Sequence, residues 1–194
     1  MVIEKTNVTQ CDSDKFSFQT IGRDKSPFKM TGQITDYIYK KGDLVETREG
    51  HNIVVADCLK VLMCLLKRDP NFTGIQYWAI GSGRDTWDRE PVDPRIDEFK
   101  LTNEEYRVAI SPSEISFLNE DFDKVEDPTN IIEIRHIFSE EDCNGVWREF
   151  AIFGGDATSS ANSGFMINKK HHPIITKTSE MTVERVLRFT LSLA

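Results

Sequence analysis

The sequence lacks the features that mark zinc-binding, secreted or membrane-spanning chains. Its 194 residues include four cysteines, no two of them in a Cys-x-x-Cys pair, so a zinc or redox motif is not indicated. No window approaches about 18 consecutive apolar residues, which predicts no membrane-spanning helix. The opening MVIEKTNVTQ has neither the basic flank nor the apolar stretch of a signal peptide. We expect a protein made in a reducing cytoplasm.

Positive charge is outnumbered by negative charge and is not clustered. Lysine and arginine total 24 against 32 aspartate and glutamate, the formal net charge is −8, and no basic run exceeds two residues. Nucleic acids and anionic lipid surfaces are bound through clustered cations, so neither is an expected partner. The acidic residues concentrate between Asp85 and Asp127, and we interpret these segments as solvated loops.

Motifs that cradle phosphate or activate a nucleophile are missing as well. The segment GGDATSSANSG at 154–164 is rich in small and polar residues. A P-loop would end in Gly-Lys-Ser/Thr before a helix, whereas Phe165 to Ile167 continue into an apolar strand. Neither Gly-x-Gly-x-x-Gly nor Gly-x-Ser-x-Gly occurs. We predict that 154–164 connects two strands, and that the protein has no enzymatic activity and no cofactor.

The histidines and carboxylates do not form a metal-binding pattern. His171 and His172 are adjacent, so on a strand they point to opposite faces. His136 shares the apolar face of its strand, which favours a hydrogen-bonded, partly buried side chain, and His51 is expected to support the start of a helix. The carboxylates of 85–98 lack EF-hand spacing. No metal site is predicted.

Alternating apolar and polar residues predict strands along most of the chain. In TVERVLRFTLSLA, for example, Val183, Leu187 and Phe189 share one face, with Arg185 near its edge. About eight strands are expected, at 28–38, 74–83, 106–118 (bent or divided at Pro112), 130–142, 146–153, 164–168, 173–176 and 182–194. Because no βαβ rhythm appears, the pattern predicts a mainly β fold, an antiparallel β-sandwich or barrel-like domain.

One segment has helical periodicity. In NIVVADCLKVLMCLLKRDP, from Asn52 to Pro70, apolar residues recur at spacings of three and four. We predict a single, largely buried α-helix over about 53–68. Asn52 is a candidate N-cap, although the β-branched residues that follow it can stay extended and delay the start by about a turn.

Two parts of the domain organisation follow from these patterns. Residues 1–26 are polar and mixed, with only Phe16 and Phe18 alternating, and are expected to form an N-terminal arm or edge strand. Residues 27–194 form a single β-rich domain.

Trp87, in RDTWDRE, lies beside carboxylates within the acidic segment. Jelly-roll lectins present tryptophan and carboxylates in such loops, so a glycan is a possible ligand. The other interpretation is a tryptophan that anchors its own loop or contacts a neighbouring subunit.

Five motifs follow one another over residues 45–194: an Asn-led apolar helix, a YxAIGxG-like strand, an RE-x-x-(I/L)-F strand, a small-residue loop and a final R-x-(L/I)-R-F strand. This order resembles small structural proteins of tailed bacteriophages and phage-tail-like particles. The matching positions are Asn52, Tyr77, Gly81, Gly83, Arg148, Glu149, Phe153, Lys177, Arg188 and Phe189.

The resemblance implies a non-enzymatic virion structural component from the tail, baseplate, collar or fibre region, assembled in the host cytoplasm. Other virion structural proteins and further copies of the chain, in a homo-oligomer, would be its partners. Arg148 and Glu149, as strand neighbours, are expected to face opposite ways and to be structural. Interface residues are expected in the arm (Phe16, Phe18) and in the 84–104 loop (Trp87, Arg95). A carbohydrate-binding β-sandwich that recognises a cell surface is the alternative, and a hydrolase with scattered catalytic residues is a third.

Overall fold

The computed structural model describes residues 28–193, in which the alternating segments form ten antiparallel strands. The elements are β1 (Phe28–Lys40), β2 (Asp43–Val54), α1 (Asp57–Lys67), β3 (Thr73–Gly81), η1 (Asp85–Trp87), β4 (Glu104–Ala109), η2 (Pro112–Glu114), β5 (Ile115–Leu118), β6 (Lys124–Val125), β7 (Ile131–Phe138), β8 (Gly145–Gly155), β9 (Phe165–Lys177) and β10 (Met181–Leu193). The predicted arm, with Phe16 and Phe18, lies outside the described residues.

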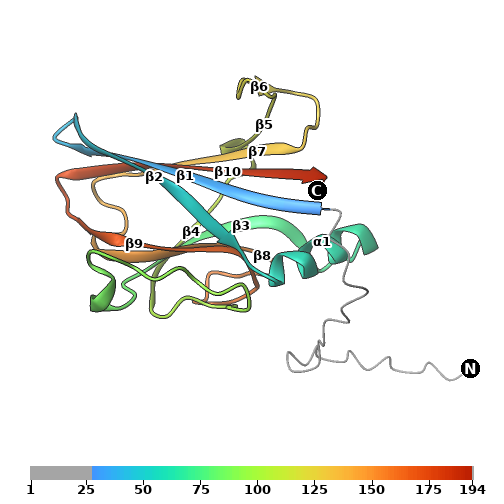
Figure 1. Cartoon of the computed structure of the whole chain (residues 1–194), viewed down its shortest axis with the longest axis horizontal. Helices are drawn as coiled ribbons and strands as arrows, with labels where there is room; N and C mark the ends of the chain where they lie inside the picture. The colour runs from blue at the N-terminus through green and yellow to red at the C-terminus, as the bar shows by residue number, and fades with distance from the viewer. Residues whose placement is uncertain (1–27, 194) are drawn as a thin grey trace, which may run out of the picture.

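The strands form one continuous sheet that curls over on itself. Their order is β4-β3-β8-β9-β2-β1-β10-β7-β5-β6. β2 and β9 pair only at Ile53–Lys169 and Val54–Asn168, so the sheet turns a corner there. Two facing layers result, β4-β3-β8-β9 and β2-β1-β10-β7, with α1 at one end (Figure 1). The prediction of a mainly β, antiparallel sandwich or barrel-like fold is confirmed.

Aromatic side chains fill the space between the layers. Trp78, Phe138, Trp147 and Phe150 are fully buried. The Phe138 ring meets Trp147 edge-on at 5.0 Å between centroids and Trp78 at 6.3 Å. Each such ring removes roughly 150–250 Å² from water, so this cluster supplies much of the apolar stabilisation that holds the two layers together.

A charged pair lies inside the same core. Asp36 of β1 and Arg185 of β10 are direct cross-strand partners. The guanidinium donates to both carboxylate oxygens at 2.6 and 2.7 Å, and it lies 4.3 Å from the Phe150 ring centroid. Arg185 was expected near the edge of its face, but it is fully buried, because Asp36 neutralises its charge where water is excluded.

The helix is present but differs from the prediction in its start and its burial. Val54 ends β2 and Ala56 is the N-cap, so Asn52 lies in a strand. Arg68 ends the helix in the left-handed region, at φ 58°. The prediction of a largely buried helix is wrong, because only Cys58 and Val61 are buried within it. The apolar pattern runs around much of α1, but the helix lies at the end of the sheet and is covered on one side.

The strand predictions need correction at three places. β2 was missed, because its residues 43–47 are exposed and carry no one-sided apolar pattern. The two-residue β6 was missed as well, and the predicted strands 164–168 and 173–176 are one strand, β9. The 106–118 segment is divided at Pro112, as one of the two interpretations had it, into β4 and β5 with η2 between them.

We predict that Asp36→Ala lowers the free energy of unfolding by about 3–5 kcal/mol, because it leaves the Arg185 charge buried and unpaired. Urea denaturation followed by tryptophan fluorescence measures this. The double variant Asp36→Leu/Arg185→Leu removes both charges and should be markedly more stable than Asp36→Ala. Equal losses in the two variants would show that packing, and not the unpaired charge, sets the cost.

Candidate functional site

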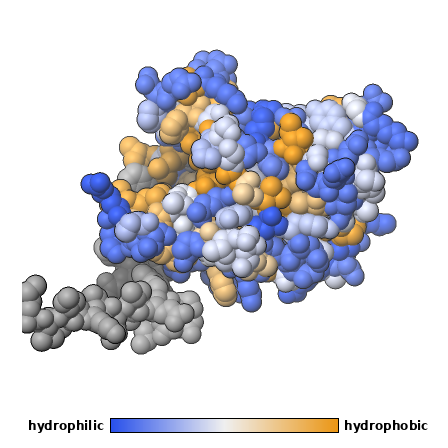
Figure 2. Space-filling model, turned by 180° about the vertical axis from the view of Figure 1, so that it is seen from behind, coloured by the Kyte–Doolittle hydropathy of each residue, from blue (hydrophilic) through white to orange (hydrophobic). Residues whose placement is uncertain are grey.

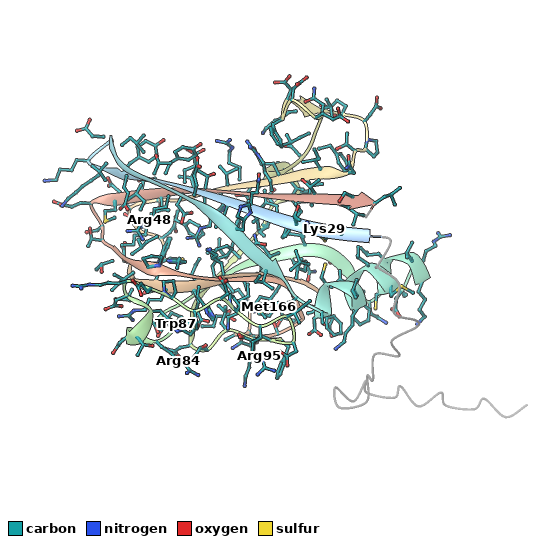
Figure 3. The ribbon with its side chains drawn as sticks, in the orientation of Figure 1. Lys29, Arg48, Arg84, Trp87, Arg95 and Met166 are labelled. Carbon is teal, nitrogen blue, oxygen red and sulfur yellow. The ribbon has the colours of Figure 1, made fainter. Side chains whose placement is uncertain are left out.

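The long connection between β3 and β4, residues 82–103, folds over the outer face of the β3-β8-β9 layer (Figure 1). Its Leu101 joins a second apolar cluster with Ala79 of β3, Ala151 of β8 and Met166 of β9. Figure 3 shows Trp87, Arg84 and Arg95 on this segment, beside the layer that contains Met166. The acidic segment is therefore a packed part of the fold as well as a surface.

Glu149 of β8 holds one end of this connection. Its two carboxylate oxygens accept hydrogen bonds from the backbone N–H groups of Asn103, at 2.8 Å, and Thr102, at 3.0 Å. The side chain is fully buried. A carboxylate that accepts several backbone hydrogen bonds away from water is a strong structural anchor.

Lys169 of β9 links two carboxylates beneath the segment. Its Nζ lies 2.6 Å from an oxygen of Glu98 and 3.1 Å from an oxygen of Glu149, and it also donates to the carbonyl of Lys100. Partial burial raises the pKa of Glu98, but hydrogen bonds from the Arg95 backbone and Lys169 outweigh it and lower that pKa overall. The ammonium therefore ties the connection to the sheet through charge as well as hydrogen bonds.

Trp87 and His171 stack within the same region. Their ring centroids are 3.7 Å apart at 18°, and Trp87 is 6% exposed. His171 bonds through Nδ1 to the carbonyl of Val92 at 2.7 Å. A carbonyl only accepts, so Nδ1 carries the proton. Burial is the main cause that lowers the pKa of His171. The indole thus acts as the anchor of its own loop.

Arg148 fixes the start of the connection. Its guanidinium contacts Asp88 at 2.5 Å and Asp85 at 3.1 Å, and donates to the carbonyl of Ser82 at 3.0 Å. Arg148 and Glu149 were expected to face opposite ways. That expectation is wrong, because the β8–β9 register shifts between Trp147 and Glu149. At such an irregularity the alternation of side chains is interrupted, and both residues bond the 82–103 segment.

Four residues on which the sequence resemblance depends also help to attach the 82–103 segment to the sheet; they are Gly81, Gly83, Arg148 and Glu149. A Cβ on Gly81 would lie 2.6 Å from the carbonyl oxygen of Asn103, and one on Gly83 would lie 2.7 Å from the Trp87 ring. Gly83 also has φ +56°, a conformation that favours glycine. The glycines leave room for the connection, while Arg148 and Glu149 bind it.

The small-residue segment between β8 and β9 is a strand connection, as predicted. Arg107 of β4 donates to the carbonyls of Thr158 and Ser163, and Glu104 accepts from the backbone N–H of Asn162. The connection is therefore tied to the edge strand β4 by a buried Arg107–Glu104 pair.

Three of the four histidines are placed as the strand patterns predicted, and His51 is not. His171 lies under Trp87, while His172 faces the interior, 6.3 Å from the Phe150 ring. His136 is partly buried and bonds Glu114 at 2.5 Å. His51 lies in β2, not beside the helix start. Within residues 28–193, no group of three or more potential ligands is arranged to hold a metal ion.

An exposed apolar surface lies on α1, which the predicted interface did not include. The stripe of apolar residues that was interpreted as core is open to solvent, with Leu66 77% and Met63 63% exposed. Arg95 of the expected interface is exposed and paired with Asp97, whereas Trp87 is covered by its own chain. The sequence does carry a sign of this exposed surface. Apolar residues lie on more sides of α1 than packing against the rest of the protein can bury.

Comparisons with known proteins identify no relative. No family model, no curated protein and no solved structure matches the chain. Over the part of the chain that the structure covers, no helix has the length and apolarity that a membrane crossing needs.

We predict that Glu149→Gln lowers the free energy of unfolding by about 1.5–3 kcal/mol, because the buried Lys169 loses a charged partner. Urea denaturation measures the loss, and limited proteolysis should show earlier cleavage within 82–103. Glu180→Gln is the matched control. It removes a carboxylate that pairs with Lys40 and Lys41 at the surface and should cost less than about 1 kcal/mol. Equal losses in the two variants would contradict the anchoring role.

We predict a stability loss at mildly acidic pH that depends on His172, whose pKa burial lowers to about 3. The folded protein keeps this imidazole neutral, while the unfolded chain binds a proton below about pH 6.5. Stability is therefore lost as pH falls, by about 2 kcal/mol between pH 7 and pH 5 for this group. His172→Phe should flatten the pH dependence of urea denaturation by that amount. An unchanged slope would refute the assignment.

Proposed function

We propose that this chain is a non-enzymatic structural subunit of a tailed-phage or phage-tail-like particle and acts through protein–protein assembly. The observation that carries the proposal is the exposed apolar face of α1 on an otherwise well-packed β body. Soluble monomers seldom expose contiguous apolar surface without using it for contact. Other virion structural proteins and further copies of the chain are the proposed partners, and the assembled virion is the proposed location.

The buried polar residues support a scaffold in preference to a catalytic site. Glu149, Lys169 and Arg148 each have protein partners at hydrogen-bond distance, and their positions are explained by holding the 82–103 segment. A catalytic constellation would instead point several such groups at a pocket. The order of motifs from Asn52 to Phe189 supports the phage-structural assignment specifically.

The alternative of a carbohydrate-binding sandwich relied on an accessible Trp87. Because that ring stacks on His171 and is nearly covered, it offers no open platform for a sugar. Glycan recognition would need a different surface of the molecule, and no described contact favours one. The assembly role is therefore preferred.

Light scattering of the full chain over a concentration series tests this proposal. We expect a discrete oligomer whose mass is a whole multiple of 22.3 kDa. The oligomer should persist at high salt, because apolar contacts are not screened by ions. A protein that is strictly monomeric at every concentration and binds glycans on an array would contradict the proposal and favour the alternative.

A further inference from the structure

The exposed side of α1 has the spacing of a helix-packing surface. Leu59, Leu62, Met63 and Leu66 follow one another at i, i+3, i+4 and i+7, and their exposure ranges from 37% to 77%. The buried residues Cys58 and Val61 turn to the body of the protein. Residues at these spacings form one stripe along a helix, which is the form of a contact with another helix.

Apolar residues of the neighbouring strand ends lie beside α1. Met30 of β1 contacts Cys58 of α1, with 3.8 Å between the sulfur atoms, and Met30 pairs with Leu191 of β10. Leu191 and Leu193 are themselves 40% and 77% exposed. α1 and the end of β10 lie at the same end of the molecule in Figure 1, and apolar residues gather at that end in Figure 2. We call the four α1 residues with Leu191 and Leu193 the end face.

An acidic segment adjoins the start of α1. The backbone N–H of Ala56, just before α1, donates to the carbonyl of Ile96 at 2.8 Å. The surrounding residues 92–99 have a net charge of −2; Asp97 pairs with Arg95 and Glu98 with Lys169, and Asp93 is the third carboxylate. The segment also exposes three large apolar side chains, Val92, Ile96 and Phe99.

The opposite end of α1 is basic. Residues 57–69 contain two acidic and three basic residues, a net charge of +1. Lys67 pairs with Asp69 at 2.9 Å, and Arg68 stands between them at the C-terminal end. A chain with a net charge of −8 repels its own copies over most of its surface. The end face is an exception, because it is acidic beside the start of α1 and basic beside its end.

We infer that the end face binds a second copy of this chain, with the two α1 helices antiparallel across a two-fold axis. This inference rests on the proposed function and names the surface through which self-assembly occurs. The two-fold places Lys67 and Arg68 of each copy near residues 92–99 of the other, so both charge contacts are favourable at once. An isologous contact of this kind needs a surface that is complementary to itself.

The size of the surface indicates how much of it must take part in a stable contact. A helix of 11 residues is about 16 Å long and about 10 Å wide with side chains, so α1 alone covers on the order of 160 Å². A stable interface buries about 800 Å² on each partner. The strand-end leucines and the apolar residues of 92–99 must therefore take part, and the dimer is expected to be concentration-dependent.

Analytical ultracentrifugation of the full chain and matched variants tests the inference. Met63→Glu/Leu66→Glu should raise the Kd of self-association at least about tenfold, because it places charges within the apolar stripe while keeping good helix formers. Leu44→Glu/Val45→Glu is the control. These residues are 53% and 58% exposed, lie at the β1–β2 hairpin away from α1 (Figure 1), and should leave the Kd unchanged.

A charge exchange tests the antiparallel arrangement separately. Arg68→Glu or Asp93→Lys alone should weaken association, and the two together in one chain should restore it, because each copy then presents the exchanged pair. Restoration supports the two-fold contact. Additive weakening in the double variant would overturn that arrangement.

The outcomes separate this inference from the proposed function. If Met63→Glu/Leu66→Glu assembles as the wild type does, the end face is not the contact and the assembly role survives through another surface. If the wild type never associates, self-assembly itself is contradicted. A monomeric wild type whose Met63 is protected from oxidation would overturn the inference and assign the covering of the face to residues 1–27.

Discussion

A buried ion pair between β1 and β10 constrains how these two strands align in the core. Arg185 and Asp36 are opposite each other in the register, and the guanidinium also lies over Phe150 of the facing layer. An unpaired guanidinium in this interior would be strongly destabilising. A shift of one residue along β10 would separate the charges and turn its apolar residues outward. The pair therefore sets both the alignment of the two strands and the face of β10 that meets the aromatic core.

A second set of buried charges organises the outside of the other layer. Glu149, Lys169 and Arg148 attach the 82–103 segment to β8 and β9 through hydrogen bonds and ion pairs, and Trp87 closes over His171. The long connection becomes a third layer over half of the sheet. With these polar groups engaged in the scaffold, the end of the molecule where α1 and the end of β10 meet is the surface that we propose for recognition. A packed β body with an exposed apolar helix at one end is consistent with that proposal.

The predictions were correct where the periodicity within a single element was enough to determine its structure. The alternation in 182–194 led to β10, and the adjacent His171 and His172 take opposite faces because β9 is extended there. Predictions failed where a second element decides the outcome. β2 has no apolar face over 43–48 and forms a strand because it pairs with β1. The two strands are joined by a turn in which Lys41 and Gly42 both have positive φ. Arg148 and Glu149 both bond the 82–103 segment because the β8–β9 register shifts beside them, and no local sequence pattern reveals that shift.

The sequence by itself determined the antiparallel β class, the existence of one helix and the role of 154–164 as a connection, since all three depend on local periodicity and turn-forming residues. Only the tertiary structure decided that Trp87 turns inward, that Arg185 lies in the core and that the outer side of α1 stays open. Periodicity shows which residues of an element share a face. Whether that face is covered depends on segments distant in the chain, and here 82–103 covers the sheet while, among the described residues, none covers the outer stripe of α1.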